Sequence, residues 1–315
     1  MNYGRILKAL RERYKVAFTP ATGLQKSSTL INLQRQAVSD CIAESVKSGK
    51  PFMLSRFGSE ELKWYIRYKI LSRGLLKRSW SYVSCKVETW KQEDRTIDNM
   101  TFVPRSLEMT EYFIREMDMA IPQIDLLGSW LAIEQSPYVK RSPSTAYAFL
   151  VDLEPYYHPN PWSAALKGKK VLVVHPMTES IARQYEKRTL LFEDPRVLPD
   201  FDLLLLKAKY FDDPVYNTWE KIYRFYLEEI HKTDFDVALL GCGSWGMPLA
   251  ARIKEKGKVA IHLGGATQLL FGITGNRWEV LYPTFTKKFV NAHWAKPLES
   301  ETPSWAVNYD KQAYW

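Results

Sequence analysis

The chain has only three cysteines in 315 residues and lacks any long hydrophobic run. Cys41, Cys85 and Cys242 show no paired spacing, which indicates neither a disulfide framework nor a zinc site. No apolar stretch approaches the length of a membrane span, and no secretory signal pattern opens the chain. These absences predict a cytoplasmic protein with reduced thiols, and they leave peripheral contact with the inner face of the cell membrane open.

Acidic residues are the minority among the charged side chains: 35 Asp and Glu stand against 44 Lys and Arg, for a formal net charge of +9. The basic excess is concentrated in residues 1–16 and 63–78. Such an excess implies an acidic partner, which can be a nucleic acid, an anionic membrane surface or a phosphorylated substrate. Nucleic acid is the least favoured of these, because no recognised nucleic-acid-binding module is present.

Apolar residues lie among five Arg and Lys residues in the N-terminal segment. They are Ile6, Leu7, Leu10 and Tyr14. This composition is compatible with a short amphipathic helix that lies on a membrane surface. The alternative that we favour is a solvated or inter-lobe helix.

Apolar runs alternate with amphipathic segments along most of the chain, which predicts an α/β fold. We expect strands at residues 52–54, 124–127, 171–174, 203–206, 237–240 and 259–263, and helices at 31–48, 106–120, 179–191 and 215–232. This alternation implies right-handed crossovers and a mostly parallel, Rossmann-like sheet flanked by helices. Beyond Pro283 no periodicity is evident, and the chain ends in an aromatic tail.

A cluster of prolines interrupts the pattern near the middle of the chain. Pro155, Pro159 and Pro161 exclude regular structure there, so this stretch is either a linker or an ordered active-site loop. We expect three parts: a basic helical N-terminal segment (1–48), the N-terminal part of the α/β domain (49–155), and a C-terminal Rossmann-like part with the glycine corners and the aromatic tail (156–315).

Small residues follow two of the predicted strands and form glycine-rich corners. They are Gly241, Gly243, Ser244, Gly246, Gly264 and Gly265. Backbone N–H groups at such corners can bind a phosphate, where the helix dipole also favours negative charge. The G-x-G-x-x-G spacing is also typical of dinucleotide sites, but the strand that should end on a ribose-binding acid ends on His262. A phosphate or diphosphate site is therefore predicted, with tight helix–strand packing as the alternative.

Two histidines close strands at the same predicted edge of the sheet, His175 and His262. Each can donate a hydrogen bond to a phosphate or transfer a proton. The alternative is a histidine that bonds to a neighbouring loop. Thr178–Ser180 follows His175 as a capping segment that can also present N–H groups to a ligand.

A third candidate site follows the first strand. It contains Arg56, Gly58, Ser59 and Glu61, and the next helix resumes at Leu62. Ser59 is the expected N-cap of that helix. A carboxylate at a strand end can hold Mg²⁺ or Mn²⁺ together with substrate phosphate oxygens. The alternative, favoured by the sequence alone, is a first helical turn whose acids complement the helix dipole.

These residues resemble a known family. The segment 56–61, Arg-Phe-Gly-Ser-Glu-Glu, is similar to the Arg-Phe-Gly-Asp-Gly-Glu segment of GT-D glycosyltransferases, bacterial enzymes once known only as a domain of unknown function. Similar segments lie at 154–157 with 160–163, at 168–176 with 179–181, at 262–273 with 277–278, and at the closing Tyr-Trp. The resemblance covers about residues 50–315. It implies a Rossmann-like fold and a D-x-E motif that binds metal and nucleotide-sugar. In this chain Ser59 replaces the first acid of that motif, so dependence on a metal is open.

The resemblance implies a glycosyltransferase that moves a sugar from a nucleotide-sugar donor to a lipopolysaccharide, capsule or other surface-glycan acceptor. Glu61, Arg56 and His175 are the expected catalytic residues, and Glu61 the expected metal ligand. The glycine corners would bind the diphosphate, with His262, Gly58 and Ser59 beside them. Tyr156, Tyr157 and Trp162 are candidates for a sugar platform. Acceptors of this kind are often lipid-linked and anionic, which the basic N-terminal third suits.

Two other functions remain open at this point. One is a non-catalytic nucleotide- or glycan-binding protein of a polysaccharide assembly complex, which the replacement of an acid by Ser59 favours. The other is a Rossmann-type nucleotide-dependent oxidoreductase, which needs a ribose-binding acid that the sequence does not supply. The sugar, the acceptor, the stereochemical outcome and the oligomeric state are not determined by the sequence.

Overall fold

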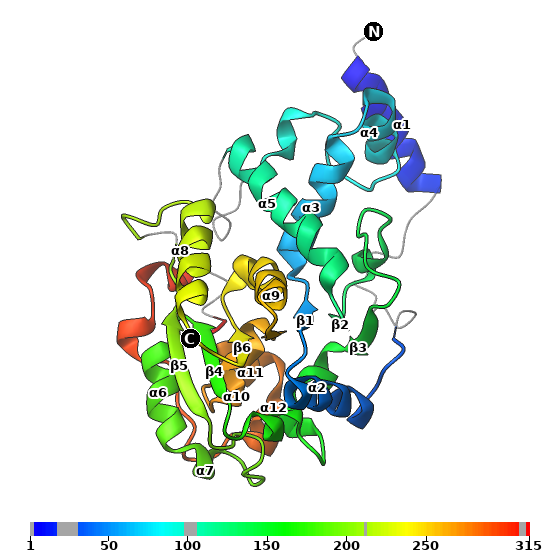
Figure 1. Cartoon of the computed structure of the whole chain (residues 1–315). Coiled ribbons are helices and arrows are strands. Elements are labelled where there is room, and N and C mark those ends of the chain that lie inside the picture. Colours follow the sequence, from blue (N-terminus) through cyan, green and yellow to red (C-terminus); the bar gives the residue numbers. More distant parts are fainter. Residues whose placement is uncertain (1–2, 18–30, 98–105, 211–212, 309–312) are drawn as a thin grey trace.

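Seven short strands pair into one sheet at the centre of the molecule (Figure 1). A computed structural model describes residues 3–17, 31–97, 106–210, 213–308 and 313–315. The strands are β1 (Phe52–Arg56), β2 (Leu126–Ser129), β3 (Ala146–Phe149), β4 (Lys170–His175), β5 (Asp202–Lys207), β6 (Val237–Leu240) and β7 (Val259–His262). Their order is β3-β2-β1-β7-β6-β4-β5, and every pair is parallel.

The central strands of this parallel sheet are buried on both faces. Central strands read as short continuous apolar runs, and β6 and β7 are buried along their whole length. Successive side chains point to opposite faces: Met53 of β1 belongs to one hydrophobic cluster and Leu54 to the other. The predicted Rossmann-like α/β fold, a mostly parallel sheet flanked by helices, is confirmed.

Helices cover both faces of the sheet. Their bounds are α1 (Tyr3–Ala17), α2 (Gln36–Ser48), α3 (Ser59–Leu71), α4 (Leu75–Val83), α5 (Leu107–Ala120), α6 (Thr178–Glu186), α7 (Arg188–Leu191), α8 (Trp219–Lys232), α9 (Gly246–Glu255), α10 (Thr267–Leu270), α11 (Asn276–Leu281) and α12 (Pro283–Phe289). One face packs on α5, α8 and α9, and the other on α2, α6 and the segment that follows β7.

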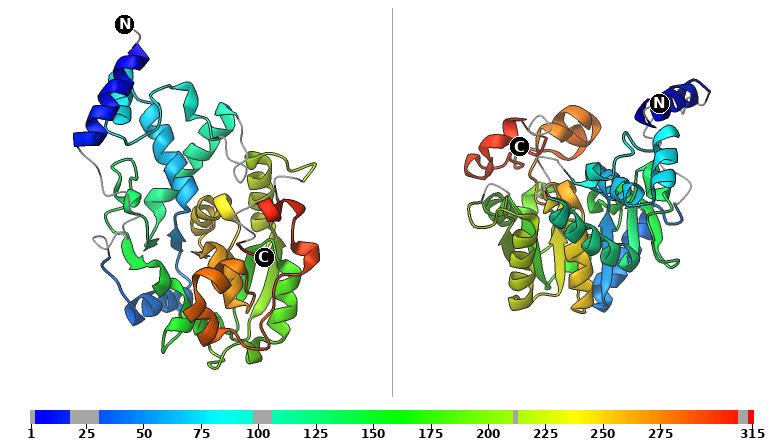
Figure 2. Two further views of the ribbon diagram at one scale, coloured as in Figure 1. Left: turned by 180° about the vertical axis from the view of Figure 1, so that it is seen from behind. Right: turned by 90° about the horizontal axis from the view of Figure 1, so that it is seen from above.

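The order in which consecutive strands are added to the sheet reverses between β4 and β6. The connection after β4 leads outward to β5, whereas the connection after β6 leads inward to β7. Ligands of open α/β sheets bind at such a reversal, outside the carboxyl ends of the strands. The same edge receives the ends of β1 and β7. In Figure 2 (right) the orange-to-red C-terminal segment is gathered at one end of the molecule.

Several local features differ from the sequence prediction. Strand β3 was not predicted, and α12 lies in the stretch without evident periodicity, where Pro283 starts the helix at a position that needs no N–H donor. Helix α2 packs Val38, Ile42 and Val46 into the core against the sheet. None of the helices in the described ranges has the length and apolar character needed to cross a bilayer.

Leu54 tests the contribution of the central strand to stability. It is fully buried in β1, in register with Leu126 of β2 and Ile261 of β7. We expect Leu54→Ala to lower the free energy of unfolding by about 2–5 kcal/mol, through lost apolar burial and the cavity that remains. Leu205→Ala, at a 37% exposed position of edge strand β5, should cost about 1 kcal/mol or less. Chemical denaturation of both variants measures the difference, and equal losses would contradict it.

Candidate functional site

Glycines at the carboxyl edge make room for the functional side chains. A Cβ atom built on Gly241 would lie 2.4 Å from the ring of His175, and one on Gly246 would lie 2.4 Å from Nε2 of His262. A Cβ on Gly264 would lie 2.9 Å from a terminal nitrogen of Arg56. These distances are shorter than any carbon contact that a folded protein tolerates. The edge therefore brings together the predicted glycine, histidine and arginine positions through close packing.

The remaining small residues have different surroundings. Gly58 lies under the carboxylate of Glu61, and Gly265 lies under the ring of Tyr314. Gly243 has a φ of 61° and open space on the side where a Cβ would stand, which makes it the corner glycine most accessible to a ligand. Ser244 is buried, and its hydroxyl accepts a hydrogen bond from Nε1 of Trp219 at 3.0 Å.

The two histidines are buried and neutral. Burial lowers the pKa of His175 to about 3, and its Nδ1 accepts a hydrogen bond from the backbone N–H of Met177 at 3.1 Å. Burial, with the charge of Arg56 as a second cause, lowers the pKa of His262 to about 3. Its Nδ1 lies 2.9 Å from the hydroxyl of Ser55. Neither ring is in the imidazolium form near neutral pH, so neither can act as a general acid. Positioning is the role that the geometry supports.

Arg56 is the unusual charge of the site. It ends β1 and is partly buried, and its Nε atom is buried without a hydrogen-bond partner in the described part of the chain. Its guanidinium lies over the ring of Trp130, 5.1 Å from the ring centroid, and Nε1 of Trp130 donates to the carbonyl of Phe57 at 2.9 Å. The backbone N–H of Trp130 is fixed in turn by the buried carboxylate of Glu134, at 3.1 Å. Neither Trp130 nor Glu134 is among the site residues predicted from the sequence.

Charged and polar side chains from distant parts of the chain surround this arginine. We call Arg56, Glu61, Glu154, Arg277 and Tyr314 the Arg56 cluster. Burial lowers the pKa of Arg56, and the charge of Arg277 adds to this lowering, whereas Tyr314, Glu61 and Glu134 oppose it. Burial also raises the pKa of Glu61, against the opposing charge of Arg56. A terminal nitrogen of Arg277 donates to the hydroxyl of Tyr314 at 2.8 Å.

Glu154 is the member of the cluster with a pKa near neutrality. Burial raises the pKa of this carboxyl to about 7, although the hydroxyl of Tyr156 and the charge of Arg56 both favour its ionised form. The Tyr156 hydroxyl donates to the Glu154 carboxylate. A buried carboxyl group whose pKa is raised toward neutrality suits proton transfer. Its role was not predicted, although it opens one of the segments that carry the family resemblance.

Glu61 is the metal ligand that the family resemblance implies. The described residues contain no group of three His, Cys, Asp or Glu side chains that could hold a metal ion. Glu61 has the positive charge of Arg56 as its neighbour, and Ser59 is exposed at the first position of α3. The N-cap of α3 is Gly58, so the prediction that Ser59 caps this helix is wrong by one residue.

The N-terminus of α6 is filled by the C-terminal tail. The buried carboxylate of Glu301 accepts hydrogen bonds from the backbone N–H of Glu179 at 2.7 Å and of Ser180 at 3.0 Å. The hydroxyl of Ser180 donates to the same carboxylate. The capping segment after His175 therefore meets an anion of the protein itself, which satisfies the N–H groups that were expected to be available to a ligand.

The three aromatic residues predicted as a sugar platform differ in exposure. Trp162 is fully buried, and its Nε1 donates to the carbonyl of Leu153 at 2.8 Å, which leaves no ring face for a sugar. Tyr156 is also buried, with its hydroxyl on Glu154. Of the three, Tyr157 alone presents a substantial surface, with 37% of its area exposed.

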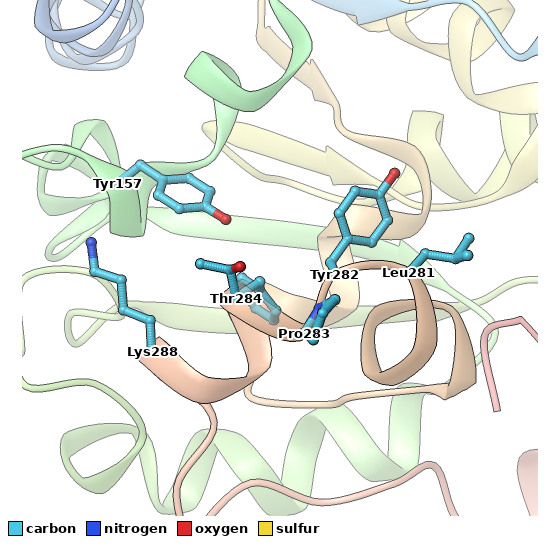
Figure 3. Close-up of a pocket in the computed structure, with 7 residues that line it drawn as sticks. Tyr157, Leu281, Tyr282, Pro283, Thr284 and Lys288 are labelled. Atoms are coloured by element: carbon cyan, nitrogen blue, oxygen red, sulfur yellow. The ribbon is translucent and has the colours of Figure 1, made fainter.

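Tyr157 lines a pocket of about 220 Å³. We call it the aromatic pocket; its lining residues are Tyr157, Leu281, Tyr282, Pro283, Thr284, Phe285 and Lys288. Figure 3 shows Tyr157 and Tyr282 on opposite sides, with Thr284 between them and Lys288 below Tyr157. Burial raises the pKa of Tyr157, and the charge of Glu154 and the hydroxyl of Tyr282 add to this effect, which places Glu154 within electrostatic reach of the pocket.

Comparisons with known proteins add little to this geometry. No family model matches the chain, and no curated protein matches it. One similar solved structure is described as the selenomethionine-substituted structure of a domain of unknown function 1792 (DUF1792). It is 16% identical, the alignment covers 82% of each chain, and the TM-score is 0.32. Similarity at this level assigns no function, so the function is inferred from the side chains of the site.

A double-mutant cycle tests whether Gly246 is required for the packing of His262. Gly246 has helical backbone angles, so alanine there should favour helix α9. The added methyl group would nevertheless overlap the imidazole of His262, and we expect Gly246→Ala to lower the free energy of unfolding by about 1–3 kcal/mol. In a His262→Ala background the same change should cost little. Additive effects in chemical denaturation would show that the glycine has another role.

Proposed function

We propose that this chain is a glycosyltransferase that transfers a sugar from a nucleotide-sugar donor to a surface-glycan acceptor, such as lipopolysaccharide or capsule. The observation that carries the proposal is Arg56, whose buried Nε has no hydrogen-bond partner in the described part of the chain. A buried polar N–H without a hydrogen-bond partner is costly, and the planar donors of a guanidinium match phosphate oxygens. An anionic ligand at the carboxyl edge of the sheet satisfies this requirement.

In this proposal, the donor diphosphate binds to Arg56 and to the open backbone of Gly243. Cleavage of the bond between the sugar and the diphosphate leaves additional negative charge on the phosphate oxygens. The guanidinium groups of Arg56 and Arg277, which influence each other electrostatically, can stabilise that charge in a site from which water is partly excluded. Glu61 lies near Arg56 and would keep its guanidinium oriented toward the ligand.

We propose that the acceptor sugar binds in the aromatic pocket. Glu154 is the general base that acts on its hydroxyl group. In the proposed step, the carboxylate of Glu154 takes the proton of an acceptor hydroxyl as the hydroxyl oxygen forms a bond to the anomeric carbon of the donor. The bond between that carbon and the diphosphate oxygen breaks, and its electron pair leaves with the diphosphate. Tyr157 and Tyr282 offer ring surfaces for the acceptor, and the hydroxyl of Thr284 offers a hydrogen bond.

A second candidate function is a non-catalytic nucleotide- or glycan-binding protein. It is favoured by one observation: Ser59 stands where the family resemblance implies an acid. Such a protein would bind nucleotide at Arg56 but would not consume the donor. Intact donor after incubation with acceptor glycans would favour this candidate.

A thermal-shift panel tests the assignment of Arg56. The panel contains UDP, GDP, CMP, UDP-sugars and NAD(P), each with and without Mn²⁺, because a ligand of the folded state raises the Tm by mass action. We expect a nucleoside diphosphate to raise the Tm, and Arg56→Gln to weaken its binding by about 10- to 100-fold, the effect of losing hydrogen bonds to a charged group. Arg183→Gln, at an exposed position, should leave binding unchanged. A response to NAD(P) alone would overturn the proposal.

The pH dependence of transfer tests Glu154. Its pKa is raised to about 7, so the carboxylate that accepts the proton is present above this pH and is lost as the pH falls below it. We expect the transfer rate to fall about tenfold for each pH unit below 7, and Glu154→Gln to lose at least 100-fold in rate with donor binding retained. Glu60→Gln, which removes an exposed carboxylate of α3, is the control. A wild-type profile that is flat between pH 5 and 8 would exclude Glu154 as the base.

A further inference from the structure

Apolar side chains form an exposed surface at the end of the molecule farthest from the C-terminal segment. Helices α1 and α4 lie side by side there (Figure 1). We call the surface the α1–α4 patch; it consists of Ile6, Leu10 and Tyr14 of α1 with Leu76 and Trp80 of α4. Leu76 is 82% exposed and Trp80 is 60% exposed. A protein in water rarely exposes so much apolar surface in one place unless it binds something.

The five residues are contiguous for geometric reasons. Ile6, Leu10 and Tyr14 follow one another at spacings of four residues, so they share one face of α1. Leu76 and Trp80 share a face of α4 in the same way. The rings of Tyr14 and Trp80 lie edge to face, with centroids 6.1 Å apart, and join the two rows.

Apart from the Tyr14–Trp80 ring contact, the two helices are held together by residues outside the patch. Leu7 is buried between them, and a terminal nitrogen of Arg11 donates to the carbonyls of Tyr82 and Val87, each at 2.6 Å. The hydroxyl of Tyr3 lies 2.8 Å from that of Ser79. Helix α1 is therefore packed against another part of the chain. This packing leaves Ile6 and Leu10 of α1 exposed.

Basic side chains border the patch. The described part of α1 carries Arg5, Lys8, Arg11, Arg13 and Lys15, against one acid, Glu12, which is paired with Lys15 at 2.8 Å. Residues 72–87 contain four basic residues and no acid. Arg13 and Lys77 make no ion pair in the described part of the chain. Leucine and tryptophan flanked by arginine and lysine are the composition of helices that lie in the interface of an anionic bilayer.

We propose that the α1–α4 patch binds the surface of an anionic lipid bilayer. The apolar row enters the boundary between headgroups and acyl chains, and the flanking cations lie at the level of the anionic headgroups. Charge decides between partners, because an apolar surface bordered by cations is repelled by a second copy of itself but is attracted to anionic lipid. The proposal does not depend on the proposed transferase activity.

Flotation with lipid vesicles tests this proposal with the full-length protein. The vesicles are phosphatidylcholine alone, or phosphatidylcholine with one quarter phosphatidylglycerol. We expect the protein to float with the anionic vesicles, to float much less with the neutral ones, and to be released by salt. The double variant Leu76→Glu/Trp80→Glu should remain with the soluble fraction. Arg13→Gln/Lys77→Gln should weaken binding about 30-fold, the effect of about 1 kcal/mol for each charge.

Control variants separate this surface from non-specific stickiness. Leu190→Glu/Val215→Glu adds the same two charges at exposed apolar positions outside the patch and should float like the wild type. All variants should retain the wild-type Tm and nucleotide response. Equal loss of flotation in this control would overturn the proposal, as would wild-type protein that does not float. Self-association of the wild type without vesicles that Leu76→Glu/Trp80→Glu abolishes would also overturn it, in favour of a second copy as the partner.

Discussion

The positive charge of Arg56 is the constraint on which the rest of the site depends. The Nε atom of this guanidinium, at the end of a central strand, is shielded from water and has no hydrogen-bond partner among the residues that the structure describes. The protein tolerates this cost through partial compensation: the ring of Trp130 lies under the cation, and Glu61, Glu134 and Glu154 supply negative charge at longer range. None of these is a direct ion pair, so an anionic ligand has the strongest remaining interaction to offer.

The glycine corners follow from the same requirement for close approach. Neutral imidazoles of His175 and His262 fill the space beside the strand ends, and each does so by lying against a glycine. Protonation of the His262 ring would place a second cation near Arg56 in a site shielded from water, which explains why burial and the arginine charge together depress the pKa of His262. The two histidines are thus uncharged side chains that shape the site. Its charged groups are those of the Arg56 cluster.

The sequence predicts the sheet and its functional edge because both depend on local pattern. Parallel strands bring their carboxyl ends to one edge, so Arg56, His175 and His262 could be placed together from their positions alone. The role of the glycines could not be decided in this way, since a glycine that exposes N–H groups and a glycine that admits a side chain look the same in a sequence. Trp130 and Tyr314 were missed because their contacts join segments that are far apart in the chain, and no periodicity indicates such contacts.

The C-terminal tail determines which part of the edge a ligand can reach. Glu301 occupies the N-terminus of α6, and Tyr314 covers Gly265. Two of the anion-binding positions that an α/β fold ordinarily offers are therefore closed by the chain itself. The open backbone of Gly243 remains, as does the Arg56 Nε, which has no hydrogen-bond partner in the described ranges. Glu154 acts electrostatically on Tyr157 of the aromatic pocket. This arrangement favours a ligand with an anionic end and a polar ring over a simple phosphate, because each part of such a ligand meets a surface of matching chemistry.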